Sequence, residues 1–149
     1  MTTNSNTSLL APNVTMTHTG IYGIIKQNNH ILVIKKARGP YTGLFDLPGG
    51  SPEPNETPEE TLIREIKEET NCDVVSYTLK TKQTILFSDF TPEYGQTGVL
   101  QHTGTLFDVT VSGTPTTEAD GLDSNGALWI DTAQLSAQNA TPFLLIASQ

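Results

Sequence analysis

A chain of 149 residues is long enough for one domain and leaves no room for a second of ordinary size. Its 16 acidic and 8 basic residues give a net charge of −8, which excludes nucleic acid duplexes and anionic membranes as expected partners, because binding to them depends on Lys and Arg. The single cysteine, Cys72, excludes an internal disulfide bond, and no apolar run approaches the roughly 20 residues of a membrane span. We therefore expect one soluble domain over residues 1–149, located in the cytoplasm.

The first third of the chain predicts a peripheral arm, a hairpin and a long loop. Residues 1–16 are rich in Thr, Asn and Ser, which favours an arm at the edge of the domain. Two runs with β-branched residues, 19–26 and 30–36, flank the turn-forming Gln27-Asn28-Asn29 and predict a β-hairpin. Residues 38–57 are dense in Gly and Pro, and a loop of this length in a compact domain is usually functional.

One helix is specified at both ends. Thr57 is a good N-cap, Pro58 stands where a missing N–H costs nothing, and Glu60 completes a capping box. Asn71 follows the last residue of the periodic pattern and tolerates the left-handed conformation that ends many helices. The sequence predicts a helix over 58–70. Further strands are expected at about 74–87, 99–111 and 127–130, with a short helix after Asp131.

The predicted helix concentrates carboxylates on one face. At about 100° per residue, Glu65, Glu68 and Glu69 share an arc, and the adjoining arc, which we expect to face the core, carries Leu62, Ile63 and Ile66. Like charges at these spacings cost about 0.2–0.5 kcal/mol per pair. A hard divalent cation such as Mg²⁺ would compensate, because it binds carboxylate oxygens. From charge alone, a solvated acidic surface is the commoner reading and stays open.

The spacing of these residues resembles the signature of the Nudix hydrolases, G-x5-E-x7-R-E-U-x-E-E-x-G-U, in which U is a bulky aliphatic residue. The matching residues are Gly50, Glu56, Arg64, Glu65, Ile66, Glu68 and Glu69. Asn71 stands where the family has Gly, and Cys72 occupies the last aliphatic position, which a buried thiol can fill. The segment that matches this signature, Gly50 to Cys72, is called the box below. The "DLPGG" stretch before the box also looks like the family's lead-in, and the resemblance covers about residues 17–146.

The resemblance implies an α/β fold, a Nudix-type α/β/α sandwich with a mixed β-sheet. It also implies a loop–helix–loop that holds Mg²⁺ or Mn²⁺ and a reaction in which water attacks phosphorus and cleaves a diphosphate linkage. The substrate class would be a nucleoside diphosphate derivative or a nucleoside triphosphate. A cation would let a protein of net charge −8 bind such an anion. Dimers are common in the family, so a homodimer is an open expectation.

The resemblance also assigns roles within the box. Glu65, Glu68 and Glu69 match the family's metal-binding carboxylates, and the carbonyl of Gly50 is a further candidate ligand. Glu56 and Arg64 match positions that order the loop and the metal site, and an ion pair between them would suit that task. The alternatives are an ordinary surface ion pair for Glu56 and Arg64, and turn formation for Gly49 and Gly50.

Candidates outside the box rest on weaker patterns. Some family members take their general base from the box and others from a distant acidic loop, for which the candidates here are Glu118, Asp120 and Asp123. A solvated loop is the alternative for that stretch. Phosphate contacts are expected from Lys35, Lys36 or Arg38, and the aromatic residues that could stack on a base are Tyr41, Phe45, Phe90 and Tyr94. Each aromatic is otherwise a core residue or loop anchor, as we expect for Trp129.

Three functions remain in contention at this point. The first is a metal-dependent Nudix pyrophosphohydrolase, and the second is a non-catalytic nucleotide-binding or regulatory module of the same fold. The intact set Glu65, Glu68 and Glu69 argues against the second. The third is a merely structural cation-binding helix, which the spacing of Gly50, Glu56 and Arg64 disfavours. The three histidines, His18, His30 and His102, show no metal-ligand spacing and receive no function.

Overall fold

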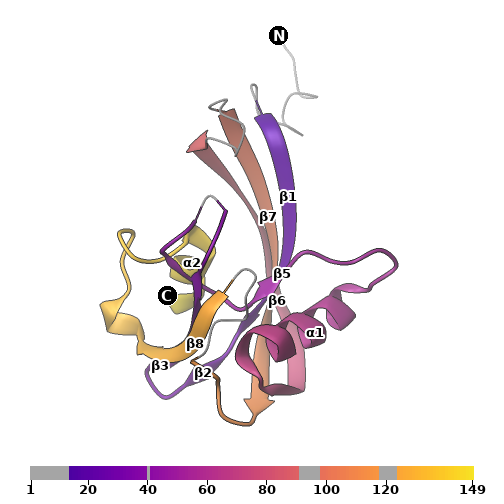
Figure 1. Ribbon diagram of the computed structural model, residues 1–149, viewed down its shortest axis with the longest axis vertical. Helices are drawn as coiled ribbons and strands as arrows, with labels where there is room; N and C mark the ends of the chain where they lie inside the picture. Colours follow the sequence, from indigo (N-terminus) through magenta and orange to yellow (C-terminus); the bar gives the residue numbers. More distant parts are fainter. Residues whose placement is uncertain (1–13, 40, 91–97, 118–123) are drawn as a thin grey trace.

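Two helices lie on opposite sides of a layer of β-strands in the computed structural model (Figure 1), which describes residues 14–39, 41–90, 98–117 and 124–149. The helices are α1 (Pro58–Thr70) and α2 (Pro142–Ser148). The predicted α/β/α sandwich with a mixed sheet is confirmed. Residues 1–13, most of the expected arm, lie outside the described residues.

The larger sheet carries the long strands, which extend beyond the helices at the top of Figure 1. In spatial order its strands are β5 (Gly49–Gly50), β1 (Val14–Ile24), β7 (Gly98–Ser112) and β6 (Asp73–Phe90). β1 pairs parallel with β7, whereas β5 with β1 and β6 with β7 are antiparallel. The sheet is therefore mixed.

The second sheet is built around β3 (His30–Lys36). All its pairings with β3 are antiparallel, and the partners are β2 (Lys26–Gln27), β4 (Phe45–Asp46) and β8 (Ser124–Asp131). The predicted strand 30–36 is confirmed as β3, but the runs 19–26 and 30–36 pair as a hairpin only beside the turn, where Asn28 has a φ of 56°. The chain leaves the first sheet after Ile24, so β1 belongs to one sheet and β2 to the other.

Side chains that alternate along the strands pack into two hydrophobic clusters, one on each face of the strand layer. Neighbouring residues such as Ile21 and Tyr22 point to opposite faces, as the period of two in a strand requires. The cluster on the α2 side comprises Tyr22, Ile24, Ile31, Val33, Leu47, Leu106, Ala140, Phe143, Leu144 and Ala147. The cluster on the α1 side comprises Ile21, Ile25, Leu32, Ile34, Leu62, Ile66, Phe107, Val109 and Ala127. Each helix is thus fixed to the strands by its own core.

Helix α1 begins and ends as predicted. The Glu60 N–H donates to the Thr57 hydroxyl, the Thr57 N–H donates to the Glu60 carboxylate at 2.9 Å, and Asn71 adopts a φ of 64°. The expected core face was wrong in one residue: Leu62 and Ile66 are fully buried, but Ile63 is 45% exposed. Ile63 lies about 100° around the helix from Leu62, beyond the face that packs on the sheet.

Other elements differ from the prediction in extent. β1 begins at Val14 rather than at residue 19, and β4 and β5 interrupt the predicted loop 38–57. The expected helix after Asp131 is one turn of 3₁₀ helix over Thr132–Gln134. Helix α2 was not predicted, although Thr141 and Pro142 open it with the same N-cap and first-turn proline that open α1.

Candidate functional site

The site is built on two glycines that bring a loop against helix α1. Gly49 and Gly50 form β5 and pair with Tyr22 and Ile21 of β1. A Cβ on Gly49 would lie 2.0 Å from the Ile21 carbonyl oxygen, and one on Gly50 would lie 2.5 Å from Glu65 Oε1. At position 49 the close atoms belong to the backbone of β1, so only glycine fits there, whereas a side chain at position 50 would displace the Glu65 carboxylate.

Arg64 lies at the centre of the carboxylate face. Its Nε and Nη2 donate to the two oxygens of Glu56 at 2.6 and 2.8 Å, a bidentate pair. Its Nη1 donates to Glu65 Oε2 at 2.6 Å and to Glu68 Oε1 at 3.2 Å. A further bond from Nη2 to the Ser51 carbonyl ties the helix to the loop. One guanidinium thus holds three of the predicted site carboxylates.

Glu69 occupies a different environment on the same helix. Its side chain is buried, and Oε1 accepts a hydrogen bond from the Gly49 N–H at 2.8 Å. Burial raises the pKa of Glu69 well above its ordinary value, and the neighbouring Glu65 adds to the shift. By contrast, the hydrogen bonds from Arg64 lower the pKa of Glu56 to about 2. The face therefore combines a fixed anion at Glu56 with a buried carboxyl at Glu69 that favours its proton.

The donor set suits a hard divalent cation. Within the described ranges, no three His, Cys, Asp or Glu side chains already converge as a closed metal cage. Arg64 accounts for this geometry, because it holds Glu65 and Glu68. Mg²⁺ is commonly bound by one or two carboxylates together with waters and substrate phosphates, so a closed cage is not required. Glu65, Glu68 and Glu69 supply carboxylate oxygens, the ligand type that such an ion prefers, beside the Gly50 loop.

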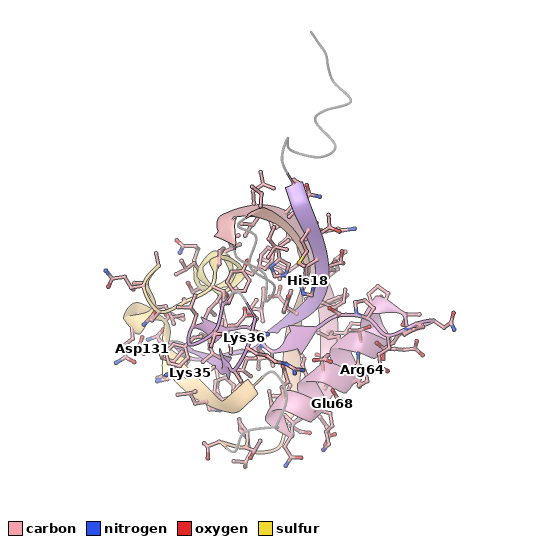
Figure 2. All side chains as sticks on the ribbon, turned by 45° about the horizontal axis from the view of Figure 1, so that its top comes forward. His18, Lys35, Lys36, Arg64, Glu68 and Asp131 are labelled. Carbon is pink, nitrogen blue, oxygen red and sulfur yellow. The ribbon has the colours of Figure 1, made fainter. Side chains whose placement is uncertain are left out.

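The two lysines at the end of β3, Lys35 and Lys36, have different surroundings. Burial raises the pKa of the Asp46 and Glu69 carboxyls, and the charge of Lys36 offsets part of that rise at both. The Lys35 ammonium lies 6.0 Å from the centre of the Phe45 ring instead. In the view of Figure 2, Lys36 lies between Lys35 and the α1 residues Arg64 and Glu68. Of the two predicted phosphate contacts in β3, Lys36 is therefore the one that faces the carboxylates.

Other predicted residues are outside this arrangement or outside the described ranges. Arg38 is exposed on the loop between β3 and β4, and Phe45 is half-buried against the α2-side cluster. The described residues do not include Tyr94, Glu118, Asp120 and Asp123. Those four assignments stay predictions.

Sequence reasoning missed a buried polar group beside the box. Asp46, in the "DLPGG" lead-in, is 3% exposed and accepts hydrogen bonds from the Thr141 hydroxyl at 2.7 Å and from the Leu47 N–H at 2.8 Å. Burial raises the pKa of Asp46. The sequence offered one signal for this residue, because Asp46 is the charged residue in the otherwise apolar and Gly-rich stretch "LFDLPGG". Asp46 joins the lead-in to the N-cap of α2.

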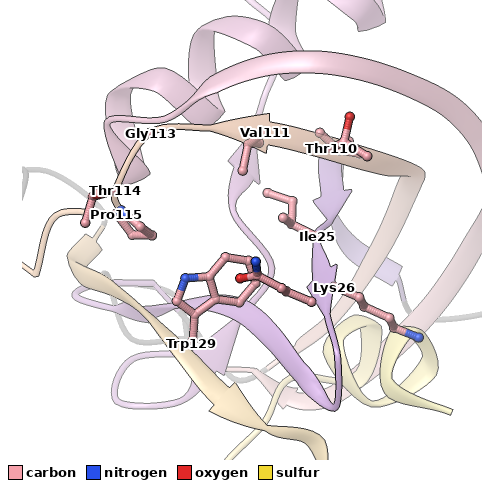
Figure 3. Close-up of a pocket in the computed structure, with 10 residues that line it drawn as sticks. Ile25, Lys26, Thr110, Val111, Gly113, Thr114, Pro115 and Trp129 are labelled. Carbon is pink, nitrogen blue, oxygen red and sulfur yellow. The ribbon is translucent and has the colours of Figure 1, made fainter.

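A separate pocket of about 300 Å³ lies away from the carboxylate face (Figure 3). It is lined by the end of β7 and the following loop, by residues 25–27 and by the indole of Trp129, whereas no box residue borders it. Trp129 was expected in the core or at its edge, and it packs half-buried against the α1-side cluster. In the part of the chain that is described, no helix is long and apolar enough to cross a membrane.

A mixed sheet between two helices, with a glycine loop held against a helix of carboxylates, is the architecture of a Nudix-type domain. The NUDIX domain family matches residues 15–145, and the chain belongs to this family.

Similar proteins of known sequence are matched over parts of their length. An ADP-ribose pyrophosphatase of Methanocaldococcus jannaschii is 56% identical over 48 residues, 32% of this chain and 28% of that protein. An 8-oxo-dGTP diphosphatase of Proteus vulgaris is 41% identical over 54 residues, 36% of this chain and 48% of that protein. A putative 8-oxo-dGTP diphosphatase of Bacillus subtilis is 31% identical over 113 residues, 75% of this chain and 64% of that protein. The chain thus spans less than two thirds of each relative.

Solved structures agree over nearly the whole chain. A MutT NUDIX hydrolase from Burkholderia pseudomallei superimposes with a TM-score of 0.67 at 26% identity, covering 89% of this chain and 96% of that one. The NUDIX domain of Shewanella oneidensis NrtR, solved in complex with ADP ribose, gives a TM-score of 0.64 at 14% identity, covering 97% and 90%. The second likeness concerns the fold alone.

Proposed function

We propose that the chain is a metal-dependent hydrolase that cleaves a diphosphate linkage in a nucleotide by attack of water at phosphorus. The observation that carries this proposal is the set Glu65, Glu68 and Glu69 on one face of α1, held beside the Gly49–Gly50 loop and organised by Arg64. Membership of the NUDIX family supports the same reaction class.

The box residues would hold Mg²⁺ or Mn²⁺ through carboxylate oxygens of Glu65, Glu68 and Glu69, with the Gly50 carbonyl as a further donor. When bound, the cation would neutralise phosphate charge and lower the pKa of a coordinated water. Arg64 and Glu56 fix the helix against the loop through their bidentate pair. The general base is a box glutamate or an acidic residue of the 118–123 stretch, such as Glu118 or Asp120.

Lys36 would orient the substrate. Its positive charge acts on Asp46 and Glu69 from β3, so it would also attract an anionic phosphate bound at the carboxylate face. Arg38, Phe45 and Tyr94 remain proposed contacts for the rest of the nucleotide. The named relatives suggest two substrate classes to test, nucleoside diphosphate sugars such as ADP-ribose and oxidised nucleoside triphosphates such as 8-oxo-dGTP.

The proposal is tested by incubating the protein with both substrate classes and with unmodified nucleoside triphosphates. Release of phosphate, pyrophosphate or nucleoside monophosphate is measured with Mg²⁺, with Mn²⁺ and with a chelator. We expect turnover with at least one class that is abolished by the chelator. Tight nucleotide binding without any turnover would instead identify a non-catalytic nucleotide-binding module, and turnover in the chelator would exclude metal dependence.

A further inference from the structure

A histidine that the sequence left without a function lies at the centre of a buried hydrogen-bond network. His102 of β7 is 2% exposed. Its Nε2 lies 2.8 Å from the Tyr22 hydroxyl, and its Nδ1 lies 3.2 Å from the Tyr41 hydroxyl. The Phe143 ring of α2 packs edge-on against the imidazole, with the ring centres 4.7 Å apart. Both ring nitrogens are therefore engaged by side chains from different parts of the chain.

The protonation states match this geometry. Burial lowers the pKa of His102 to about 3, so the imidazole is neutral at pH 7 and has one N–H donor and one acceptor nitrogen. Burial raises the pKa of Tyr41 to about 12 and raises that of Tyr22 as well, so both phenols keep their protons. In either tautomer, one tyrosine donates to His102 and the other accepts from it. All three buried polar groups are satisfied.

The two tyrosines belong to different segments, and each segment adjoins residues of the candidate site. Tyr22 is the register partner of Gly49 in the box loop. Tyr41 belongs to the connection between β3 and β4, of which residues 37–39 and 41–44 are described. Its ends are joined by two hydrogen bonds of 2.9 Å each, from the Lys36 N–H to the Leu44 carbonyl and from the Gly43 N–H to the Lys36 carbonyl. The loop carries Arg38 and begins directly after Lys36.

We propose that His102 is a positioning residue that links Tyr41 to Tyr22. It so holds residues 41–44, and with them the connection that carries Arg38 and follows Lys36, at a fixed distance from the Gly49–Gly50 loop. The role of these cations in binding substrate phosphate rests on the proposed function. The network itself does not, because its geometry is a property of the free protein.

Packing alone does not account for this choice of residues. Phe or Leu would fill the space without buried polar groups, which are costly unless every one is hydrogen-bonded. A satisfied network instead fixes a unique arrangement, because each partner is satisfied in only one relative position. The bridge joins residues 22, 41 and 102, which come from β1, a loop and β7, so it specifies how the loop sits on the sheet.

The kinetic test uses Tyr41→Phe and His102→Gln, with Tyr77→Phe as the matched control. Tyr41→Phe keeps the ring and removes the hydroxyl, so we expect a rise in KM of about fivefold to tenfold with kcat within about twofold, the effect of one lost buried hydrogen bond on binding. Gln retains a donor and an acceptor, so His102→Gln should raise KM less than His102→Ala. Tyr77→Phe removes a hydroxyl from β6, outside the network, and should change neither constant.

An unchanged KM in Tyr41→Phe would overturn the proposal, as would a loss confined to kcat. Hydrogen exchange in the absence of substrate provides a second measurement that is independent of activity. We expect the amides of residues 42–44 to exchange at least about fivefold faster in Tyr41→Phe, with the amides of α1 unchanged. If the wild-type protein hydrolyses nothing, the proposed function fails and exchange alone decides this inference. Equal exchange, or faster exchange throughout the protein, would refute it.

Discussion

At the scale of single residues, Arg64 decides how closely the carboxylates of the box can be packed. Seven glutamates lie between Gly50 and Cys72 and only two basic residues accompany them. The sequence showed that Arg64 was near the cluster, but the contacts to Glu56, Glu65 and Glu68 together depend on the rotamer and on the fold of the loop. A cation that binds Glu65 and Glu68 competes directly with this guanidinium.

Glu68 is the residue whose replacement tests the proposed metal face most simply, because it is exposed and contributes no core packing. We expect Glu68→Gln to lower kcat by at least about a hundredfold, as for the loss of a group that supports a catalytic metal or a proton transfer. The measurement is steady-state hydrolysis at saturating Mg²⁺. The matched control is Glu59→Gln on the same helix, and comparable activity in the two variants would contradict the assignment.

At the scale of elements, α1 was predictable because its signals are local. The capping box, Pro58 and Asn71 fix both ends within four residues of the boundary. The long strands were located within a few residues, whereas β4 and β5 were expected to be loop. The pairing of the strands was not predicted, since β1 pairs with β5 and β7 from distant parts of the sequence. The same Thr-Pro signal at Thr141 was missed, because the short apolar segment after it gives little helical periodicity.

The buried end of α1 also has a thermodynamic consequence. The pKa of Glu69 is raised by burial, so between its ordinary value and the folded-state value the unfolded chain is ionised while the folded chain keeps its proton. The free energy of unfolding contributed by this group therefore falls as pH rises through that window. Glu69→Gln removes the titration and keeps a carbonyl oxygen for the Gly49 N–H.

We accordingly expect Glu69→Gln to be more thermostable than the wild type at pH 7 in a chelator. A gain of about 1 kcal/mol corresponds to a rise in Tm of about 2–4 °C for a chain of this size. The difference should vanish below about pH 4, where the carboxyl is protonated in both states. Thermal unfolding of both proteins, followed by circular dichroism from about pH 3 to 8, measures the difference in Tm. If Glu69→Gln were less stable than the control Glu59→Gln at every pH, the predicted destabilisation by the ionised Glu69 would be excluded.

At the scale of the whole molecule, β1 contacts both hydrophobic clusters and the Gly49–Gly50 loop. Ile21 and Tyr22 enter the two clusters from opposite faces of one strand and pair with Gly50 and Gly49. The residues of the box could be listed from the sequence. Their position in the fold depends on β1, whose pairing with β5 and β7 could not be predicted from the sequence. The network around His102 was hidden for the same reason: residues 22, 41 and 102 meet only after both sheets have formed.

Cys72, fully buried directly after α1, makes this assembly measurable in the unmodified protein. Because it is the only cysteine, any thiol labelling reports on this one position. A reagent reaches the sulfur only when the end of α1 leaves the sheet, so the labelling rate gives the frequency of that opening. We expect native labelling at least about a thousandfold slower than in urea, followed by mass spectrometry. Labelling at the unfolded rate would show that the carboxylate helix is not held in place.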